Sequence, residues 1–204
     1  TADCDPANVA EQLQGFKQAE GLVRRFGHEP SVLHAANSAA LFRHPETHFD
    51  WVRPGISLYG YPGSDSIDAP LRPAMRWRTE VLRLRTLRPG ESAGYGRSFR
   101  ATRETRLATI PLGYGDGLLR SASNRGQVLI RGVRCPIVGN IAMDLTTVDV
   151  SEVPRVDLGD EALLLGEQEG AVLDARDLAA AAGTIPYEVL TNVSRRVPRV
   201  YLNR

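Results

Sequence analysis

The sequence predicts an α/β plus all-β protein, in which about 60 residues of parallel α/β structure precede an antiparallel β domain of about 130 residues. Helical and strand patterns alternate up to residue 60, a segment rich in proline and glycine follows, and apolar and polar residues alternate from Met75 onward. Hydrophobic residues make up 42% of the chain and charged residues 24%, which is ordinary for a globular protein. These observations place a first domain at 1–60, a linker at 61–73 and a second domain at 74–204.

A long amphipathic helix is predicted at the start of the chain, over residues 5–26. Asp5 and Pro6 are favourable residues for an N-cap and a first helical position, and Gly27 can end the helix. Between these limits, apolar residues recur on one helical face at Val9, Leu13, Phe16, Val23 and Phe26.

Two short apolar runs predict buried strands on either side of a second helix. The strands are expected at 31–34 and 49–53, and the alternation of helix and strand is typical of parallel βα units. Asn37 can cap the helix between them, which is expected at 39–43.

The second domain is predicted to consist mainly of antiparallel strands. The alternation that starts at Met75 changes phase at Leu82, which indicates one strand with a β-bulge near Val81 and Leu82. Asp174 can cap a short helix that runs to Ala182. Further strands are expected at 106–112, 127–130, 136–138, 145–150, 162–165 and 200–201.

The composition argues against several kinds of partner. Lys and Arg number 25 against 24 Asp and Glu, so no broad positive field attracts nucleic acid or an anionic membrane. No apolar run approaches the ~20 residues that span a bilayer, no signal-peptide pattern opens the chain, and a cytoplasmic protein is expected. Cys4 and Cys135 are typical of incidental thiols in a reducing compartment, and the four histidines show no metal-ligand spacing with them.

Three segments contain candidate functional residues. Ser38 follows the first predicted strand at a helix start, where a hydroxyl and free amides can bind an anion; an ordinary capped loop is the alternative. Arg53 and Gly55 lie at the end of the next strand, where α/β proteins bind ligands; a structural salt bridge fits equally well. Tyr114 stands among the three glycines of 113–117, which leave its phenol accessible; a half-buried core tyrosine is the alternative.

Six segments carry a family resemblance when they are taken together and in order. They are HAANSAA at 34–40, FDWVRPGISLYG at 49–60, YGRSF at 95–99, TIPLGYGDG at 109–117, PIVGNIAMD at 136–144 and TIPYEVLTNVSRRVPRVY at 184–201. These segments resemble those of the alanine racemase family, whose members use pyridoxal 5'-phosphate. Each segment alone is a weak signal, whereas six with compatible spacing make a strong one.

The resemblance implies the C-terminal half of such an enzyme. The expected fold is the last βα units of a TIM-like barrel followed by a mostly antiparallel β-barrel or β-sandwich domain. The implied activity is the interconversion of L-alanine and D-alanine, which supplies D-alanine for peptidoglycan. The implied assembly is a homodimer whose active sites are shared between subunits.

The resemblance also assigns roles to residues of this chain that hold the cofactor. Ser38, the amides of Gly55 and Ile56, and the hydroxyl of Tyr187 would hold the phosphate. Arg53 would face the pyridine nitrogen and leave it unprotonated, because arginine does not release its proton.

A second set of implied roles concerns the substrate. Tyr114 would be the base on one face of the substrate Cα and would act in the partner's site. Met143 and Asp144 would close that site near the substrate carboxylate.

Lysine is nearly absent from the chain, since 24 of its 25 basic residues are arginine. The only lysine is Lys17, which is expected to be solvated on the first helix. The family's Schiff-base lysine belongs to the earlier half of the barrel. The chain is therefore expected to be a C-terminal fragment that is inactive without its N-terminal half.

Alternatives remain open at this point. The β domain could be a non-catalytic module for dimerisation or ligand binding. Ala142 stands where relatives commonly have Cys or Ser, and Asn140 where Arg is common, so serine or another small amino acid is an alternative substrate. A related decarboxylase is disfavoured, because Cys135 precedes Pro136 outside the loop in which such an enzyme would need its cysteine.

Overall fold

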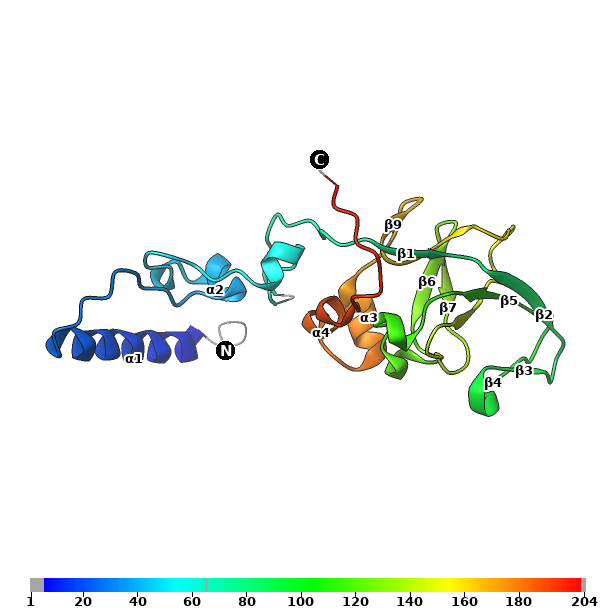
Figure 1. Ribbon diagram of the computed structural model, residues 1–204, viewed down its shortest axis with the longest axis horizontal. Coiled ribbons are helices and arrows are strands. Elements are labelled where there is room, and N and C mark those ends of the chain that lie inside the picture. Colours follow the sequence, from blue (N-terminus) through cyan, green and yellow to red (C-terminus); the bar gives the residue numbers. More distant parts are fainter. Residues whose placement is uncertain (1–5, 65, 203–204) are drawn as a thin grey trace. The chain divides into compact units, whose positions relative to one another are not determined.

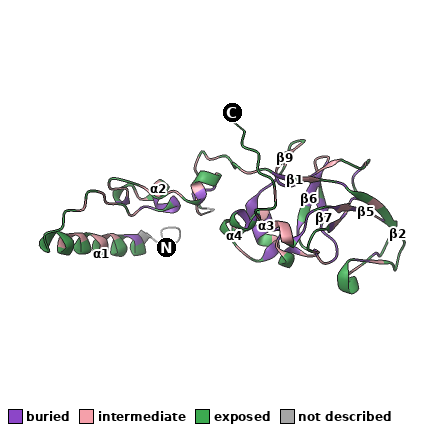
Figure 2. Cartoon of the chain, viewed as in Figure 1, coloured by how far each residue is buried: buried purple, intermediate pink, exposed green. Residues whose placement is uncertain are grey.

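The computed structural model describes residues 6–64 and 66–202 and divides into two compact units, 1–74 and 75–204 (Figure 1). Asp5, the expected first N-cap, lies outside the described residues. Buried residues gather in the strands and in the helix α3 of the second unit, whereas the first helix α1 is largely exposed (Figure 2).

Helix α1 (Pro6–Arg25) forms the predicted amphipathic helix of the first unit. Val9 is buried on its apolar face, and the Phe16 ring packs against Phe49 with ring centroids 5.0 Å apart. Gly27 follows with a positive φ of 82°, which glycine adopts at little cost. The predicted helix and its end are both present.

The middle of the first unit contains a short helix but only a trace of sheet. Helix α2 (Ser38–Arg43) is capped as predicted, since the Asn37 side chain accepts a hydrogen bond from the Ala40 amide. The two predicted strands are reduced to one parallel bridge between His34 and Trp51. The prediction of two full strands at 31–34 and 49–53 is therefore wrong, because two segments joined by a single bridge form no regular ladder.

The segment after Tyr59 folds back on the first unit. The 3-10 helices η1 (Pro45–Thr47) and η2 (Ile56–Tyr59) precede it. A Cβ atom at Gly60 would lie 2.0 Å from the carbonyl oxygen of Arg72, so only glycine permits this approach. The Ala74 amide then donates to the Tyr59 carbonyl at 3.0 Å.

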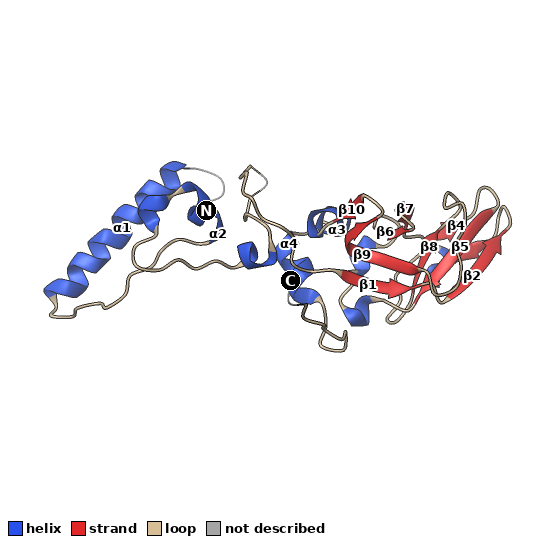
Figure 3. Cartoon of the chain, turned by 90° about the horizontal axis from the view of Figure 1, so that it is seen from above, coloured by secondary structure: helices blue, strands red, loops and turns tan. Residues whose placement is uncertain are grey.

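The second unit is built from antiparallel sheets (Figure 3). The larger sheet has the order β1 (Trp77–Glu80), β9 (Glu161–Gln168), β6 (Gln127–Ile130) and β7 (Val133–Pro136), and β10 (Ala171–Leu173) also pairs with β9. A second sheet consists of β2 (Arg83–Leu87), β5 (Thr105–Ile110) and β8 (Thr146–Asp149). A third contains β3 (Ser92–Ala93) and β4 (Phe99–Arg100). The strands expected at 106–112, 127–130, 145–150 and 162–165 are present, whereas 136–138 contributes only the end of β7.

The chain changes sheets where a β-bulge was expected. The Val81 amide donates to Asp160, beside β9, whereas the next amide, of Leu82, donates to Thr109 in β5. The residues before and after this point therefore belong to two strands of different sheets, and the prediction of one bulged strand is wrong. The two sheets meet again at the bridge between Ile137 and Val148. These two junctions connect the larger sheet to the second sheet.

Two helices follow the strands. Helix α3 (Ala175–Ala182) begins at the predicted cap, since Asp174 accepts hydrogen bonds from the Arg176 and Asp177 amides. Helix α4 (Pro186–Asn192) packs against α3.

The strand expected at 200–201 is wrong. Val200 and Tyr201 are exposed and form no ladder with any described residue. The Arg199 guanidinium instead donates to the carbonyls of Val193, Ser194 and Val197, which folds this part of the chain into a compact turn.

Candidate active site

Tyr114 lies in a turn that directly follows strand β5. The 3-10 helix η4 (Tyr114–Asp116) contains it. The Tyr114 amide donates to the Ala142 carbonyl at 3.0 Å, and the Gly115 amide donates to the Met143 carbonyl at 2.9 Å. Two consecutive backbone hydrogen bonds thus join the Tyr114 turn to the segment that contains Met143 and Asp144.

The glycines around Tyr114 are explained by close backbone approach. A Cβ atom on Gly113 would lie 2.2 Å from the Ala142 carbonyl oxygen. Gly117 has a φ of 108°, and a Cβ there would lie 2.3 Å from the Asn192 carbonyl oxygen. The unusual glycine content of 113–117 therefore reflects packing of this turn against two other segments.

Arg196 links the same two segments by ion pairs. Its Nε donates to Asp116 Oδ1 at 2.8 Å, and its Nη2 donates to Asp144 Oδ1 at 2.6 Å. The hydrogen bonds to Asp116 and then Asp144 raise the pKa of the Arg196 guanidinium above its usual value. The other carboxylate oxygen of Asp116 accepts from the Gly113 amide at 2.8 Å.

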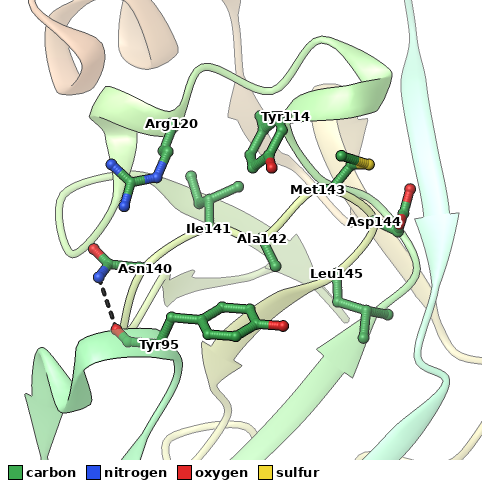
Figure 4. Close-up of a pocket in the computed structure, with 9 residues that line it drawn as sticks. All are labelled: Tyr95, Tyr114, Arg120, Asn140, Ile141, Ala142, Met143, Asp144 and Leu145. Carbon is green, nitrogen blue, oxygen red and sulfur yellow. Dashed lines mark hydrogen bonds between the residues drawn. The ribbon is translucent and has the colours of Figure 1, made fainter.

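A pocket of about 440 Å³ opens beside this turn (Figure 4). The Tyr114 hydroxyl points toward the centre of the pocket, and Met143 and Asp144 lie on one side of it. Asn140 donates from Nδ2 to the Tyr95 carbonyl at 2.8 Å and so closes another side. The full lining consists of Tyr95, Tyr114, Arg120, Asn140, Ile141, Ala142, Met143, Asp144 and Leu145.

Ser38 is the centre of a second polar cluster, which lies in the first unit. Its buried Oγ accepts hydrogen bonds from the amides of Gly55 at 2.9 Å and Ser57 at 3.3 Å, and the Ser57 hydroxyl lies 3.2 Å away. Gly55 is exposed, and the nearest atom to a Cβ placed on it is Ser38 Oγ at 3.9 Å. The protein itself therefore leaves open space above this glycine.

The same cluster has donors available for an anion. In the part of the chain that the structure describes, no group accepts the hydrogen of the Ser38 hydroxyl or of the Ile56 amide. Arg53 donates from Nη2 to the Ala35 carbonyl at 2.9 Å, which holds a permanent cation two residues before Gly55. A hydroxyl, an amide and open space above glycine fit a phosphate group.

The structure thus brings the predicted residues together in two groups. Ser38, Gly55 and Ile56 meet in the first unit, with Arg53 two residues before Gly55. Tyr114, Met143 and Asp144 meet in the second unit, which also contains the half-exposed Tyr187 on α4.

Four further residues at these places were not among the predicted site residues. Ser57 could have been found from its spacing, since it follows Gly55 by two residues in the predicted anion loop. Tyr95 lies inside the YGRSF segment that carried the resemblance, but nothing there indicated a pocket. Arg196 lies inside the 184–201 segment of the resemblance, but nothing there indicated its ion pairs. Arg120 gave no signal, because arginine is common throughout the chain.

Other kinds of site are not indicated among the described residues. Residues 6–64 and 66–202 contain no cluster of His, Cys, Asp and Glu that could hold a metal ion. None of the helices described combines the length and the apolar character needed to cross a membrane. Burial raises the pKa of the Cys135 thiol to about 12, so this cysteine is an unreactive core residue at neutral pH.

The two units define a class of proteins in which the end of a β/α barrel is joined to a β domain. A family model described as "Alanine racemase, N-terminal domain" matches residues 1–62, and one described as "Alanine racemase, C-terminal domain" matches residues 74–201. The chain belongs to the alanine racemase family.

Relatives of known sequence and structure agree with this membership. The alanine racemase of Sorangium cellulosum is 46% identical over 205 residues, which are 98% of this chain and 54% of that protein. The crystal structure of the Bacillus anthracis alanine racemase with bound L-Ala-P has a TM-score of 0.94 and 33% identity, covering 100% of this chain and 53% of that one. The crystal structure of a Bartonella henselae alanine racemase with covalently bound pyridoxal phosphate has a TM-score of 0.85 and 33% identity, covering 98% of this chain and 53% of that one. The chain therefore spans about half the length of these relatives.

Proposed function

We propose that this chain acts as part of an alanine racemase, together with the upstream segment that its relatives possess. The reaction is the interconversion of L-alanine and D-alanine with pyridoxal 5'-phosphate, and the product D-alanine serves peptidoglycan synthesis in the cytoplasm. Family membership supports this proposal, as do the ligands named for the solved relatives from Bacillus anthracis and Bartonella henselae. Within the chain, the position of Tyr114 is the observation that carries it.

The position of Tyr114 supports a role in proton transfer. Racemisation exchanges the proton on Cα from one face to the other, so each face needs its own acid–base group. The Tyr114 phenol points into the pocket, while two backbone hydrogen bonds hold its turn against Ala142 and Met143. Tyr114 takes the proton on one face of Cα, and Met143 and Asp144 border the space for the substrate carboxylate.

The Ser38 cluster is proposed to hold the cofactor phosphate. Pyridoxal phosphate, when bound, supplies the electron sink that makes the Cα proton removable. Ser38 would donate its hydroxyl hydrogen to the phosphate, the Ile56 amide would donate beside it, and Tyr187 would add a further hydroxyl. The Gly55 amide, which was expected to bind the phosphate directly, donates to Ser38 Oγ at 2.9 Å and would orient that hydroxyl instead. Arg53 would face the pyridine nitrogen and, because arginine does not release its proton, would leave that nitrogen unprotonated, which would favour simple proton exchange over other reactions of the cofactor.

The assembly that we propose is a homodimer with shared sites. Tyr114, Met143 and Asp144 serve the cofactor held by the other subunit. Dimerisation is then a condition of catalysis, and dilution below the dimer dissociation constant abolishes racemisation.

The first experiment tests the need for the upstream segment. The chain's only lysine, Lys17, is exposed on α1, so this chain has no lysine placed to hold the cofactor covalently. The 204-residue chain with pyridoxal phosphate and L-alanine is expected to form no D-alanine, and adding the upstream half is expected to restore activity. D-alanine formation by the chain alone at the restored rate would contradict the proposal, as would an absorption band of bound cofactor that Lys17→Arg removes.

Serine is the second candidate substrate, because two pocket residues differ from the common family pattern. Ala142 and Asn140 line the pocket, and the methyl group of Ala142 is small. Comparing kcat/KM for L-alanine and L-serine in the restored enzyme decides between them, since a pocket built to bind the serine hydroxyl rejects alanine far more strongly than an apolar pocket rejects serine.

A further inference from the structure

Arg196 connects two segments that are distant in sequence and adjacent in the pocket. Its two ion-pair partners are Asp116, in the Tyr114 turn, and Asp144, in the 142–144 segment. The guanidinium also lies 3.4 Å from the Met143 carbonyl oxygen through Nη2. One side chain from the C-terminal turn therefore contacts both segments at once.

We propose that Arg196 is a positioning residue, which fixes the Tyr114 phenol relative to the pocket by clamping its turn to the 142–144 segment. This inference rests on the proposed role of Tyr114. Few contacts separate Arg196 from Tyr114. Arg196 donates to Asp116 Oδ1, and Asp116 Oδ2 accepts from the Gly113 amide. Gly113 directly precedes Tyr114 in the chain. The same guanidinium holds Asp144, so both sides of the Tyr114–Ala142 backbone hydrogen bond are restrained.

The clamp is expected to affect geometry more than stability. The Arg196 side chain is 45% exposed and that of Asp144 is 62% exposed. Exposed ion pairs contribute about 0–1 kcal/mol to folding. Two backbone hydrogen bonds already join the turn to Ala142 and Met143, so loss of Arg196 leaves the fold in place but lets the turn shift. A displacement of ~1 Å at a reacting group can lower the rate about 100-fold.

Arginine is required here rather than any cation. Nε and Nη2 donate to different carboxylates at 2.8 and 2.6 Å, which a rigid planar fork can do simultaneously. A lysine ammonium is a single point charge on a flexible side chain, so it can pair with one of the two carboxylates while the other loses its partner. Lysine at this position is therefore expected to restore the charge but only part of the positioning.

The test uses the full-length enzyme with the substitutions Arg196→Gln and Arg196→Lys. Arg196→Gln is expected to lower kcat about 10- to 100-fold with KM for alanine changed less than about twofold. Arg196→Lys is expected to fall between Arg196→Gln and the unsubstituted enzyme. The matched control is Arg131→Gln, because Arg131 also bridges two carboxylates, of Asp157 and Asp160, at a similar exposure of 39% but away from the pocket. Arg131→Gln is expected to leave kcat unchanged.

A second readout separates positioning from general damage. In deuterium oxide, exchange of the Cα hydrogen reports proton removal from each enantiomer separately, and a base on one face of Cα serves one enantiomer only. Arg196→Gln is expected to slow exchange from the enantiomer that Tyr114→Phe also slows, about 10-fold or more relative to exchange from the other enantiomer. Equal slowing of both exchanges, or an unchanged kcat in Arg196→Gln, would overturn the inference.

The control on Tyr114 distinguishes failure of the inference from failure of the proposed function. If Tyr114→Phe abolishes racemisation while Arg196→Gln does not slow it, only the clamp is wrong. If Tyr114→Phe has no effect, the proposed role of Tyr114 is wrong, and the inference fails with it. Thermal unfolding of Arg196→Gln and Arg131→Gln is expected to give similar small losses, and a much larger loss for Arg196→Gln would assign Arg196 a structural role instead.

Discussion

The backbone amide of Tyr114 lies 3.0 Å from the carbonyl oxygen of Ala142 and donates a hydrogen bond to it. This bond joins residues 28 positions apart in the sequence and places the tyrosine on the wall of the pocket that Met143 and Asp144 also border. It belongs to the backbone, so a change of the Tyr114 side chain leaves it intact. The chemistry of the phenol can therefore be tested without disturbing the position of the chain.

Tyr114→Phe removes only the phenolic oxygen. In the full-length enzyme we expect kcat/KM for racemisation to fall by ~10²–10⁴, the usual contribution of an acid–base residue. L-alanine and D-alanine have equal free energies, so kcat/KM must fall equally in both directions. Racemisation assays started from each enantiomer measure this.

The matched control for this substitution is Tyr95→Phe. Tyr95 lines the same pocket and is 75% exposed, but its carbonyl rather than its side chain accepts the hydrogen bond from Asn140. We expect its effect on kcat to be much smaller than that of Tyr114→Phe. Comparable losses for both tyrosines would show that Tyr114 is one lining residue among several.

Gly113→Ala is expected to damage the pocket through its backbone. The new Cβ would lie 2.2 Å from the Ala142 carbonyl oxygen and 2.5 Å from that of Met143, and neither backbone group can rotate away as a side chain could. Overpacking of this kind costs ~1–3 kcal/mol, and the separated segments lose the Tyr114–Ala142 hydrogen bond. Denaturant unfolding of the 204-residue chain checks the loss of stability.

The control for Gly113→Ala is Gly21→Ala, within α1. No atom lies within 4 Å of a Cβ at Gly21, and alanine in a helix interior is favoured over glycine by ~1 kcal/mol. The two substitutions are therefore expected to change stability in opposite directions. A stabilising Gly113→Ala would show that the turn and the 142–144 segment are not in contact.

Ser38→Ala is expected to weaken cofactor binding in the full-length enzyme. The substitution removes the oxygen that accepts from the Gly55 and Ser57 amides, and the loss of such partly buried hydrogen bonds costs ~0.5–1.5 kcal/mol each. Asn37→Ala is the control. It removes the N-cap of α2, which costs a similar ~1 kcal/mol of stability, but it leaves the Ser38 hydroxyl in place. Titration with pyridoxal phosphate is expected to show a larger rise in Kd for Ser38→Ala, and equal rises would indicate a purely structural serine.

Elements with local sequence signals could be predicted well. Asn37 and Asp174 cap helices because a short polar side chain can reach an amide two or three residues ahead, which depends on neighbouring residues alone. Strand β6 (Gln127–Ile130) was predicted at its observed bounds, because it pairs with β7 across a turn at Arg131 and Gly132, which both have positive φ.

Features that depend on distant partners could not be predicted. A change of phase at Val81 and Leu82 has the same sequence pattern whether one strand bulges or the chain passes to another sheet, and only the distant strands β5 and β9 decide. At the site, the glycines around Tyr114 were a visible signal, but their cause is contact with residues 142–143 and 192. Arg196 had no signal, because its partners lie 80 and 52 residues away.

Asp160 is expected to make the stability of the second unit decrease at acidic pH. It lies where the chain changes sheets, since its carbonyl accepts from the Val81 amide while its carboxylate accepts from Arg131. The hydrogen bond from Arg131 lowers the pKa of Asp160 in the folded chain. The unfolded chain, with a pKa near ~3.9, then takes up a proton first as the pH falls. The stabilisation by ionised Asp160 is therefore full above pH ~4 and is lost as the pH falls through the folded-state pKa.

Denaturant unfolding of the 204-residue chain between pH 7 and pH 2 tests this dependence. Asp160→Asn is expected to be less stable than the unsubstituted chain at pH 7 and to lose less further stability below pH ~4, because its side chain binds no proton. Glu152→Gln is the control, since Glu152 is 76% exposed and pairs with Arg103 away from the sheet junction. Its acid profile is expected to follow that of the unsubstituted chain. If the stability of Asp160→Asn and of the unsubstituted chain changed in parallel with pH, the Asp160–Arg131 ion pair would contribute nothing to stability at the sheet junction. The backbone hydrogen bond from Val81 to Asp160 would then hold the junction without it.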